Sequence, residues 1–102
     1  MSTSYPISDA AASLPPEQLE AAFQEASAAV KTLSERPSNM VLLQLYALYK
    51  QGGEGDARGD RPGMTDFVAR AKFDAWTALA GTDPATAQRQ YISLVDALRA
   101  AS

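Results

Sequence analysis

The sequence contains neither cysteine nor histidine. Without cysteine, the chain has no disulfide, no thiolate nucleophile and no cysteine-ligated zinc site. Without histidine, it lacks the usual general base near neutral pH, on which serine triads depend, and the commonest ligand of transition metals. These two absences argue against an enzyme, and we expect no catalytic residues, no metal site and no cofactor.

Basic residues and long apolar runs are also scarce. The sequence has 9 Lys and Arg against 12 Asp and Glu, a formal net charge of -3. This balance argues against general nucleic-acid binding, which requires a basic face. No apolar run approaches the ~20 residues that span a bilayer, and residues 1–14 lack the basic start and continuous apolar core of a secretory signal. We therefore expect a cytoplasmic monomer with no transmembrane segment.

Apolar residues recur at helical spacing. At 102 residues and 46% hydrophobic content, the chain is long and apolar enough for one domain with a core. Residues three and four apart form apolar stripes in four stretches, at about 15–33, 39–51, 66–80 and 84–98. Pro15-Pro16-Glu17 and Asp83-Pro84 are typical helix starts. No segment alternates with period two, so the sequence predicts an all-α four-helix bundle.

The first residues differ from the rest in composition. Residues 1–14 are rich in Ser, Thr and Ala and contain Pro6, so they offer too little apolar surface to offset the entropy of ordering. Tyr5 and Ile7 are isolated apolar residues, which seldom fix a terminus. We expect a flexible N-terminal tail over 1–14, followed by a domain over 15–102.

A glycine-rich stretch separates the second and third predicted helices. Residues 52–63 contain five glycines, which predicts a long irregular connection. The stretch has no G-x-x-x-x-G-K-[ST] pattern, so nothing marks it as a phosphate-binding loop. A connection of this length can cross the end of a bundle and let the two helices run parallel.

The second predicted helix carries the residues that are most suggestive of a ligand. Tyr46, Tyr49 and Lys50 fall on adjoining faces, because helical residues three and four apart are neighbours. Two phenols and an ammonium on one wall suit a phosphorylated ligand that carries a ring. Half-buried packing residues and a solvated lysine are the commoner explanation of such a triplet, and spacing alone does not choose between the two. The apolar width added by Leu42 and Leu43 indicates either several helix neighbours or an apolar ligand groove.

Between Phe23 and Leu98 the chain carries a series of motifs: Leu45-Tyr46-x-Leu48-Tyr49-Lys50-Gln51, Gly55-Asp56, Arg61-Pro62-Gly63-Met64, Asp66-Phe67, Ala71-Lys72, Asp74-Ala75-Trp76 and Tyr91. The order and spacing of these motifs give this part of the chain a resemblance to the acyl-CoA-binding protein family. It implies an up-down-down-up bundle and a non-catalytic carrier that binds long-chain acyl-CoA, maintains its pool and delivers it to lipid enzymes.

The resemblance also implies a binding site. The residues that fall on the family's acyl-CoA-binding positions are Lys31, Tyr46, Ala47, Leu48, Tyr49, Lys50, Lys72 and Tyr91, and those near the acyl chain are Leu42 and Leu43. By the family pattern, Lys50, Lys72 and the Tyr46 hydroxyl would hold the ribose 3′-phosphate. Tyr49 would pack against the adenine, and Lys31 and Tyr91 would bracket the rest of the head group.

Two positions depart from the family pattern. Val68 stands where many members carry a lysine, and Phe73 replaces a common tryptophan, so we expect a lower affinity than is typical of the family. A helical adaptor that binds protein partners and no small ligand is the alternative reading of the same bundle. An acyl-CoA hydrolase is disfavoured, because no base accompanies the scattered Ser and Asp residues.

Overall fold

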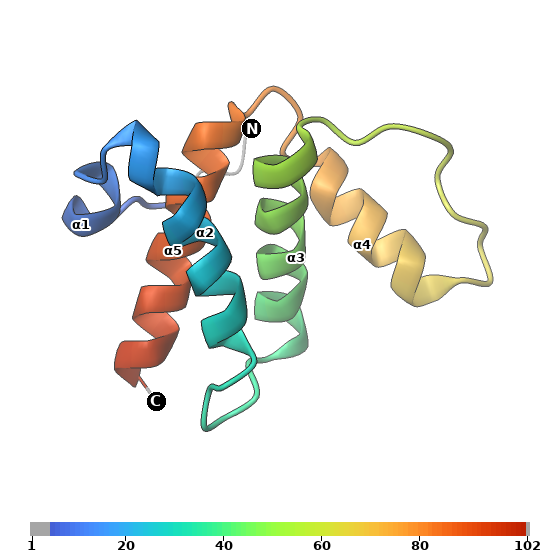
Figure 1. The fold of residues 1–102 in the computed structure, drawn as a ribbon. Coiled ribbons are helices and arrows are strands. Elements are labelled where there is room, and N and C mark those ends of the chain that lie inside the picture. Colours follow the sequence, from blue (N-terminus) through green and yellow to red (C-terminus); the bar gives the residue numbers. More distant parts are fainter. Residues whose placement is uncertain (1–4, 102) are drawn as a thin grey trace.

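The computed structural model describes residues 5–101, and every regular element in this range is a helix. The elements are α1 (Asp9–Ala12), α2 (Pro16–Val30), α3 (Asn39–Glu54), α4 (Phe67–Thr77) and α5 (Pro84–Ala101) (Figure 1). The prediction of an all-α bundle is therefore confirmed. None of the described helices has the length and apolar character to cross a bilayer.

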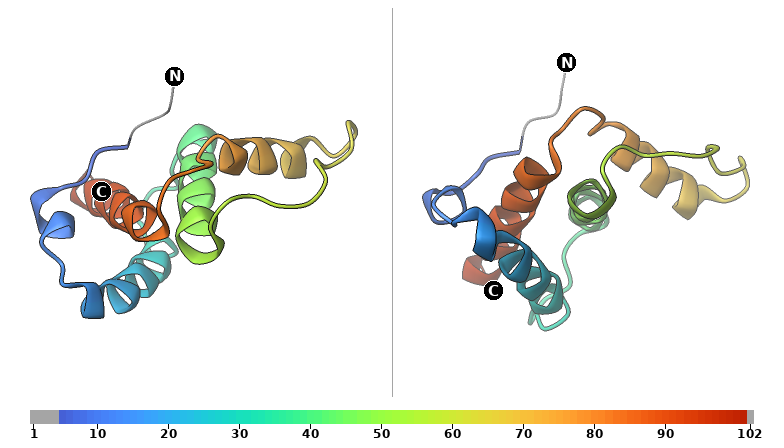
Figure 2. Two further views of the ribbon diagram at one scale, coloured as in Figure 1. Left: turned by 90° about the horizontal axis from the view of Figure 1, so that it is seen from above. Right: turned by 45° about the horizontal axis from the view of Figure 1, so that its top comes forward.

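The four long helices follow the predicted order of directions. In Figure 1, α2 and α5 run downward, whereas the consecutive helices α3 and α4 both run upward. Figure 2 shows α3 between α4 on one side and α2 and α5 on the other, so α4 packs on the bundle through α3. The connection from Gly55 to Asp66 follows α4 back along its length, which is how two sequential helices become parallel.

The core lies between α2, α3 and α5. Its fully buried members include Phe23 from α2, Leu48 from α3 and Val95 from α5. These residues lie on the predicted apolar stripes, so burial of the stripes is what brings the three helices together. Side-chain caps fix where α3 and α4 begin: Ser38 accepts a hydrogen bond from Val41 N (3.2 Å), and Asp66 accepts one from Ala69 N (3.4 Å).

The connection after α3 begins later than the sequence predicted. We expected irregular structure from Gly52 onward, which is wrong for Gly52 and Gly53, because α3 continues to Glu54 and ends at Gly55 with φ 80°. Gly52 is buried, and Gln88 Nε2 donates a hydrogen bond to its carbonyl at 2.9 Å. Here the absence of a side chain allows close packing between α3 and α5, which stabilises the helical turn.

The connection is anchored at its start and near its middle. Asp56 accepts hydrogen bonds from Gln51 Nε2 and from Gly81 N, both at 2.9 Å, and these bonds lower the pKa of its carboxyl. Trp76 Nε1 donates to Gly55 O at 2.8 Å, and Arg61 forms a two-pronged ion pair with Asp74 at 2.6 and 2.8 Å. These contacts position α4 against the C-terminal end of α3.

The local sequence did not predict α1, which lies within the expected tail. Ser8 N donates to Ser93 Oγ at 2.9 Å, and Arg89 donates to the carbonyls of Ala11 (2.6 Å) and Leu14 (2.9 Å). Ala11 is only 1% exposed. Residues 5–14 are thus held against α5 by side chains far away in the sequence, whereas residues 1–4 of the predicted tail lie outside the described part.

Candidate functional site

The first wall of the candidate site is aromatic. The Tyr49 ring stacks on Phe23 of α2, with centroids 5.1 Å apart and an interplanar angle of 25°. Tyr91 of α5 meets Phe23 edge-on at 5.3 Å and lies 5.7 Å from Tyr49. Tyr49 remains 36% exposed whereas Tyr91 is 4% exposed. Tyr49 therefore presents part of a fixed ring to solvent, with Phe23 and Tyr91 supporting it.

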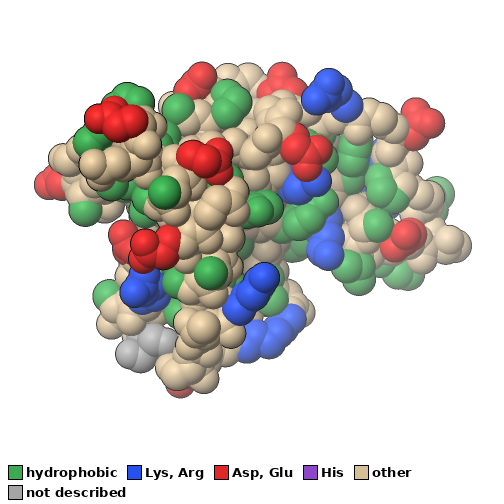
Figure 3. Space-filling view, in the orientation of Figure 1, with side chains coloured by type: hydrophobic (Ala, Val, Ile, Leu, Met, Phe, Trp, Pro, Cys, Tyr) green, Lys and Arg blue, Asp and Glu red, His purple; other side chains and the backbone are tan. Residues whose placement is uncertain are grey.

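The second wall is cationic and lies where α3 meets α4. Lys50 Nζ lies 5.0 Å from the ring centroid of Trp76, and Lys72 Nζ lies 5.3 Å from the ring centroid of Tyr46. Each ammonium is thus placed over an aromatic ring of the other helix. Figure 3 shows Lys and Arg side chains beside hydrophobic surface on this face of the protein. The structure therefore places Tyr46, Lys50 and Lys72 at the contact between α3 and α4, and their binding of a phosphate stays a prediction.

Lys50 has a second partner on its own helix. Its ammonium forms an ion pair with Glu54, one turn further along α3. The hydrogen bond to Glu54 raises the pKa of Lys50, so the ammonium stays charged throughout the physiological range. The Lys50 and Glu54 side chains are 26% and 52% exposed, so an incoming anion can reach this pair.

An apolar groove of about 640 Å³ opens between the N-terminal halves of α3 and α4. It is lined by Arg36, Asn39, Leu42, Leu43, Phe67, Val68, Ala71 and Lys72. Leu42 and Leu43 are the two residues that the resemblance placed near the acyl chain. Sequence reasoning did not assign the apolar residues of α4 to the groove, although their spacing places them on one helical face.

Lys72 links the groove to the cationic wall. It also lines a second hollow, of about 340 Å³, together with Tyr46, Phe73 and Trp76. A ligand with an apolar chain and an anionic head could therefore lie with the chain between α3 and α4 and its charge near Lys72. This is the arrangement that an amphipathic anion requires.

Four of the predicted residues lie elsewhere or face inward. Ala47 is 1% exposed and Leu48 is fully buried, so their side chains pack in the core, and their contact with a ligand stays a prediction. Tyr91 is nearly buried and contributes by supporting Tyr49. Lys31 follows the C-terminal end of α2, at the end of the bundle where α3 begins, whereas Lys50 lies in the last turns of α3.

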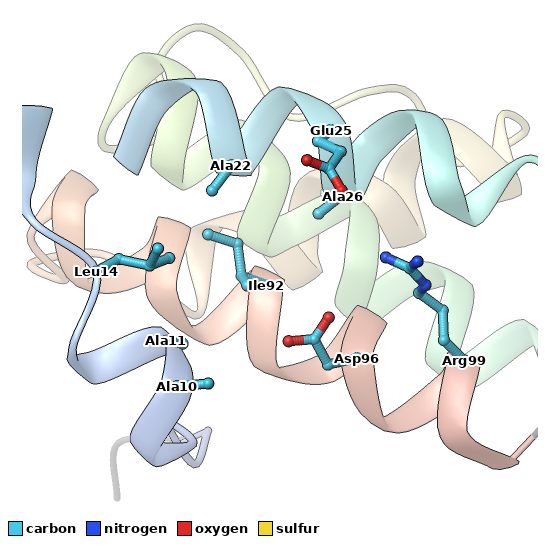
Figure 4. A pocket seen from close by; sticks show the side chains of 9 residues that line it. All are labelled: Ala10, Ala11, Leu14, Ala22, Glu25, Ala26, Ile92, Asp96 and Arg99. Carbon is cyan, nitrogen blue, oxygen red and sulfur yellow. The ribbon is translucent and has the colours of Figure 1, made fainter. Parts of the chain in front are cut away.

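A separate hollow of about 180 Å³ lies between α1, α2 and α5. Figure 4 shows that alanine side chains line much of it, with Glu25, Asp96 and Arg99 around them. It contains none of the predicted site residues, and its two carboxylates make it unsuitable for a polyanion. Within residues 5–101 we also find no cluster of acidic side chains that could hold a metal ion.

The sequence model of the family described as Acyl CoA binding protein matches residues 20–95. The chain belongs to the acyl-CoA-binding protein family. It is 49% identical over 76 residues to Acyl-CoA-binding protein homolog 1 of Caenorhabditis elegans, an alignment that covers 74% of this chain and 88% of that protein. It is 43% identical over 76 residues to the Acyl-CoA-binding protein of Dictyostelium discoideum, covering 74% of this chain and 90% of that protein.

Solved structures of the acyl-CoA-binding protein family have the same fold. Acyl-CoA-Binding Protein 2 of Oryza sativa superposes with a TM-score of 0.75 at 39% identity, covering 78% of this chain and 89% of that one. An enzyme is also similar in sequence: Enoyl-CoA delta isomerase 2 of Rattus norvegicus is 46% identical over 80 residues. That match covers 78% of this chain but only 20% of the enzyme. The similarity thus extends over nearly the whole of the family's small proteins and over a minor part of the isomerase.

Proposed function

We propose that this protein binds long-chain acyl-CoA thioesters and carries them without chemical change. The observation that carries this proposal is the continuity of the apolar groove with the cationic wall through Lys72. A thioester of CoA has the same two parts, an alkyl chain and a polyanionic head. Membership of the acyl-CoA-binding protein family supports the same ligand.

The head group would lie across α3. Coenzyme A carries about four negative charges at neutral pH, so nearby ammonium groups attract it strongly. Lys50 and Lys72 lie over rings on either side of the α3–α4 contact, and we assign the ribose 3′-phosphate to them and to the Tyr46 hydroxyl. The exposed part of Tyr49 offers a ring for the adenine.

The acyl chain would lie in the groove that Leu42 and Leu43 line on α3 and Phe67 lines on α4. Burial of each methylene contributes ~0.8 kcal/mol, so we expect affinity to rise with chain length until the groove is full. A shape open at the surface suits a carrier, because the chain can enter and leave without unfolding of the bundle.

Two observations favour a carrier over an enzyme or an adaptor. The relatives that this chain matches nearly end to end are acyl-CoA-binding proteins, whereas the isomerase is matched over a fifth of its length. A protein adaptor does not require ammonium groups that are fixed over rings beside an open apolar groove. We further propose a cytoplasmic monomer that delivers acyl-CoA to lipid enzymes, as membership of the acyl-CoA-binding protein family suggests.

Calorimetric titration with palmitoyl-CoA, palmitate and bare CoA tests this function. We expect tight binding of the ester and far weaker binding of either half, because each half satisfies one wall of the site. Leu43→Ser should weaken binding of the ester and leave the affinity for bare CoA unchanged, since Leu43 lines only the groove. Equal affinity for palmitate and palmitoyl-CoA would refute the head-group site, and no heat with any of the three would favour the adaptor.

A further inference from the structure

The groove between α3 and α4 carries two cations that lie apart along its length. The charged residues that line it are Arg36 and Lys72, and no carboxylate is among the lining residues. Lys72 Nζ lies 5.3 Å from the ring centroid of Tyr46, whereas Arg36 belongs to the connection that precedes α3 (Figure 1). Tyr46 follows Asn39, the first residue of α3, by about two helical turns, so the two cations mark different ends of the groove.

The surface between the two cations is apolar. It is formed by Leu42 and Leu43 on α3 and by apolar side chains of α4. In the proposed function the head group lies near Lys72, so an acyl chain that follows this surface runs toward Arg36. The end of the chain that is remote from the thioester then meets a guanidinium, which a terminal methyl group cannot use.

Arg36 is accessible to an anion. It is exposed, and its Nη1 donates a hydrogen bond to Asn39 Oδ1 at 3.2 Å. No carboxylate of residues 5–101 forms an ion pair with it. Glu35, its neighbour in the chain, lines a different hollow, which Arg36 also borders. Because a guanidinium has five N–H donors, Arg36 can bind a second acceptor while it keeps its bond to Asn39.

We propose that Arg36 binds the terminal carboxylate of a dicarboxylic acyl chain, so that the protein also carries mono-CoA esters of long-chain dicarboxylic acids. The planar guanidinium matches a carboxylate through two parallel N–H···O bonds. A carboxylate held among the leucines would lose its hydration without gaining a partner, so only a chain long enough to reach Arg36 fits. This inference rests on the proposed function, because it requires the head group at Lys72.

Calorimetric titration with palmitoyl-CoA and hexadecanedioyl-CoA tests this site. The two ligands have the same head group and the same chain length, and they differ only at the last carbon, which is a methyl group in one and a carboxylate in the other. The test variants are Arg36→Gln, which removes the cation, and Arg36→Lys, which keeps the charge but loses the two-pronged geometry. Arg99→Gln, which removes a cation beside the distant hollow, is the matched control.

We expect Arg36→Gln to lower the affinity for hexadecanedioyl-CoA by about three- to tenfold more than the affinity for palmitoyl-CoA, and this excess should shrink as salt is added. A loss that both ligands share reports only the positive field acting on the head group, so the excess measures the proposed contact. Arg36→Lys should show a smaller excess than Arg36→Gln, and Arg99→Gln should show none.

The proposal is overturned if Arg36→Gln weakens the binding of both ligands equally, because the terminal carboxylate then lies in water. It is also overturned if Arg99→Gln produces the same excess, or if the wild type binds palmitoyl-CoA but not hexadecanedioyl-CoA. Each of these results leaves the proposed function intact. A wild type that does not bind palmitoyl-CoA would instead refute the proposed function, and this inference with it.

Discussion

Lys50 illustrates how a single side chain is prepared for an anion. Its ammonium lies over the Trp76 ring and pairs with Glu54, so it is already held in place before a ligand arrives. Trp76 also donates to Gly55 O, which fixes the ring under the ammonium. Glu54, however, already pairs with the ammonium to which a phosphate is proposed to bind. A bound phosphate must therefore compete with Glu54 or tolerate its charge.

We predict that Glu54→Gln raises the affinity for palmitoyl-CoA by about three- to tenfold, because it removes a charge that repels the phosphate and releases Lys50. Glu25→Gln removes the same charge beside the distant hollow and should change the affinity much less. Calorimetry at low ionic strength measures both variants. An unchanged or lower affinity for Glu54→Gln would show that the phosphate does not lie beside Lys50.

Tyr91 leads to a prediction about stability at high pH. Burial raises the pKa of its hydroxyl from 10.0 to about 12, with a smaller contribution from Tyr49. The unfolded chain therefore loses this proton first, and the free energy of unfolding falls as pH rises between 10.0 and about 12. Once Tyr91 is deprotonated in both the folded and the unfolded state, the free energy of unfolding has fallen by about 3 kcal/mol.

Tyr91→Phe has no proton to lose, so we predict a shallower fall in its stability over that range. Urea unfolding of the variant and the wild type at a series of pH values gives the comparison, in which other titrating groups contribute equally. Parallel stability curves for the two proteins would contradict the assigned role of Tyr91.

The sequence allowed part of this residue-scale description. Tyr46, Lys50 and Lys72 were predicted together through the family's motifs. The Lys50–Glu54 pair was not predicted, although its i, i+4 spacing is visible in the sequence. Gly52 and Gly53, which lie between Lys50 and Glu54, indicated an end of the helix. Lys50 and Glu54 were therefore assigned to different elements.

At the scale of elements, Gly52 determines how closely α3 approaches its neighbours. A Cβ at this position would lie 2.9 Å from Gln88 Cγ and 3.0 Å from Phe23 Cζ, whereas a Cβ at Gly53 would meet nothing within 4 Å. The two glycines are adjacent in the same helix but face different surroundings. Local propensity treats them alike, and only the packing of α3 on α2 and α5 distinguishes them.

We predict that Gly52→Ala lowers the free energy of unfolding by about 1–3 kcal/mol, because the buried Phe23 ring has little room to move. Gly53→Ala, the matched control, should be neutral or stabilising by up to about 1 kcal/mol, because alanine favours a helix. Thermal or urea unfolding of the two variants is the measurement. If Gly52→Ala is as stable as Gly53→Ala, the close packing described here is wrong.

Helix periodicity was sufficient to predict the four long helices: α2, α3 and α5 bury stripes that are visible in the sequence, whereas α4 buries only Trp76. It could not predict α1, whose position depends on hydrogen bonds from Arg89 and Ser93 of α5. It also could not pair the α4 side of the groove with Leu42 and Leu43. Contacts between elements arise from tertiary packing, which a single sequence does not display.

At the scale of the whole molecule, the order of the helices determines where the ligand can bind. The long connection makes α3 and α4 parallel, and their C-terminal ends meet at Lys50 and Trp76 while their N-terminal ends diverge into the groove. The polar and apolar parts of the site therefore lie along one axis. In the proposed function, an overall acidic protein binds a polyanion in this way because two of its lysines, Lys50 and Lys72, lie at the contact between α3 and α4.

The most direct test of this account compares palmitoyl-CoA with palmitoyl-3′-dephospho-CoA on the wild type, Lys50→Gln and Lys72→Gln. Arg99→Gln, which removes a cation beside the distant hollow, is the control. Charge-assisted hydrogen bonds contribute ~1.5 to 3 kcal/mol each, so each lysine variant should lower the affinity for palmitoyl-CoA by about one to two decades. The same variants should lower the affinity for the dephosphorylated ligand much less. That ligand lacks the phosphate that the lysines are proposed to contact, and the effects of removing two contacting groups are not additive. Equal losses for the two ligands would contradict the account, since the lysines would then act only as general charge.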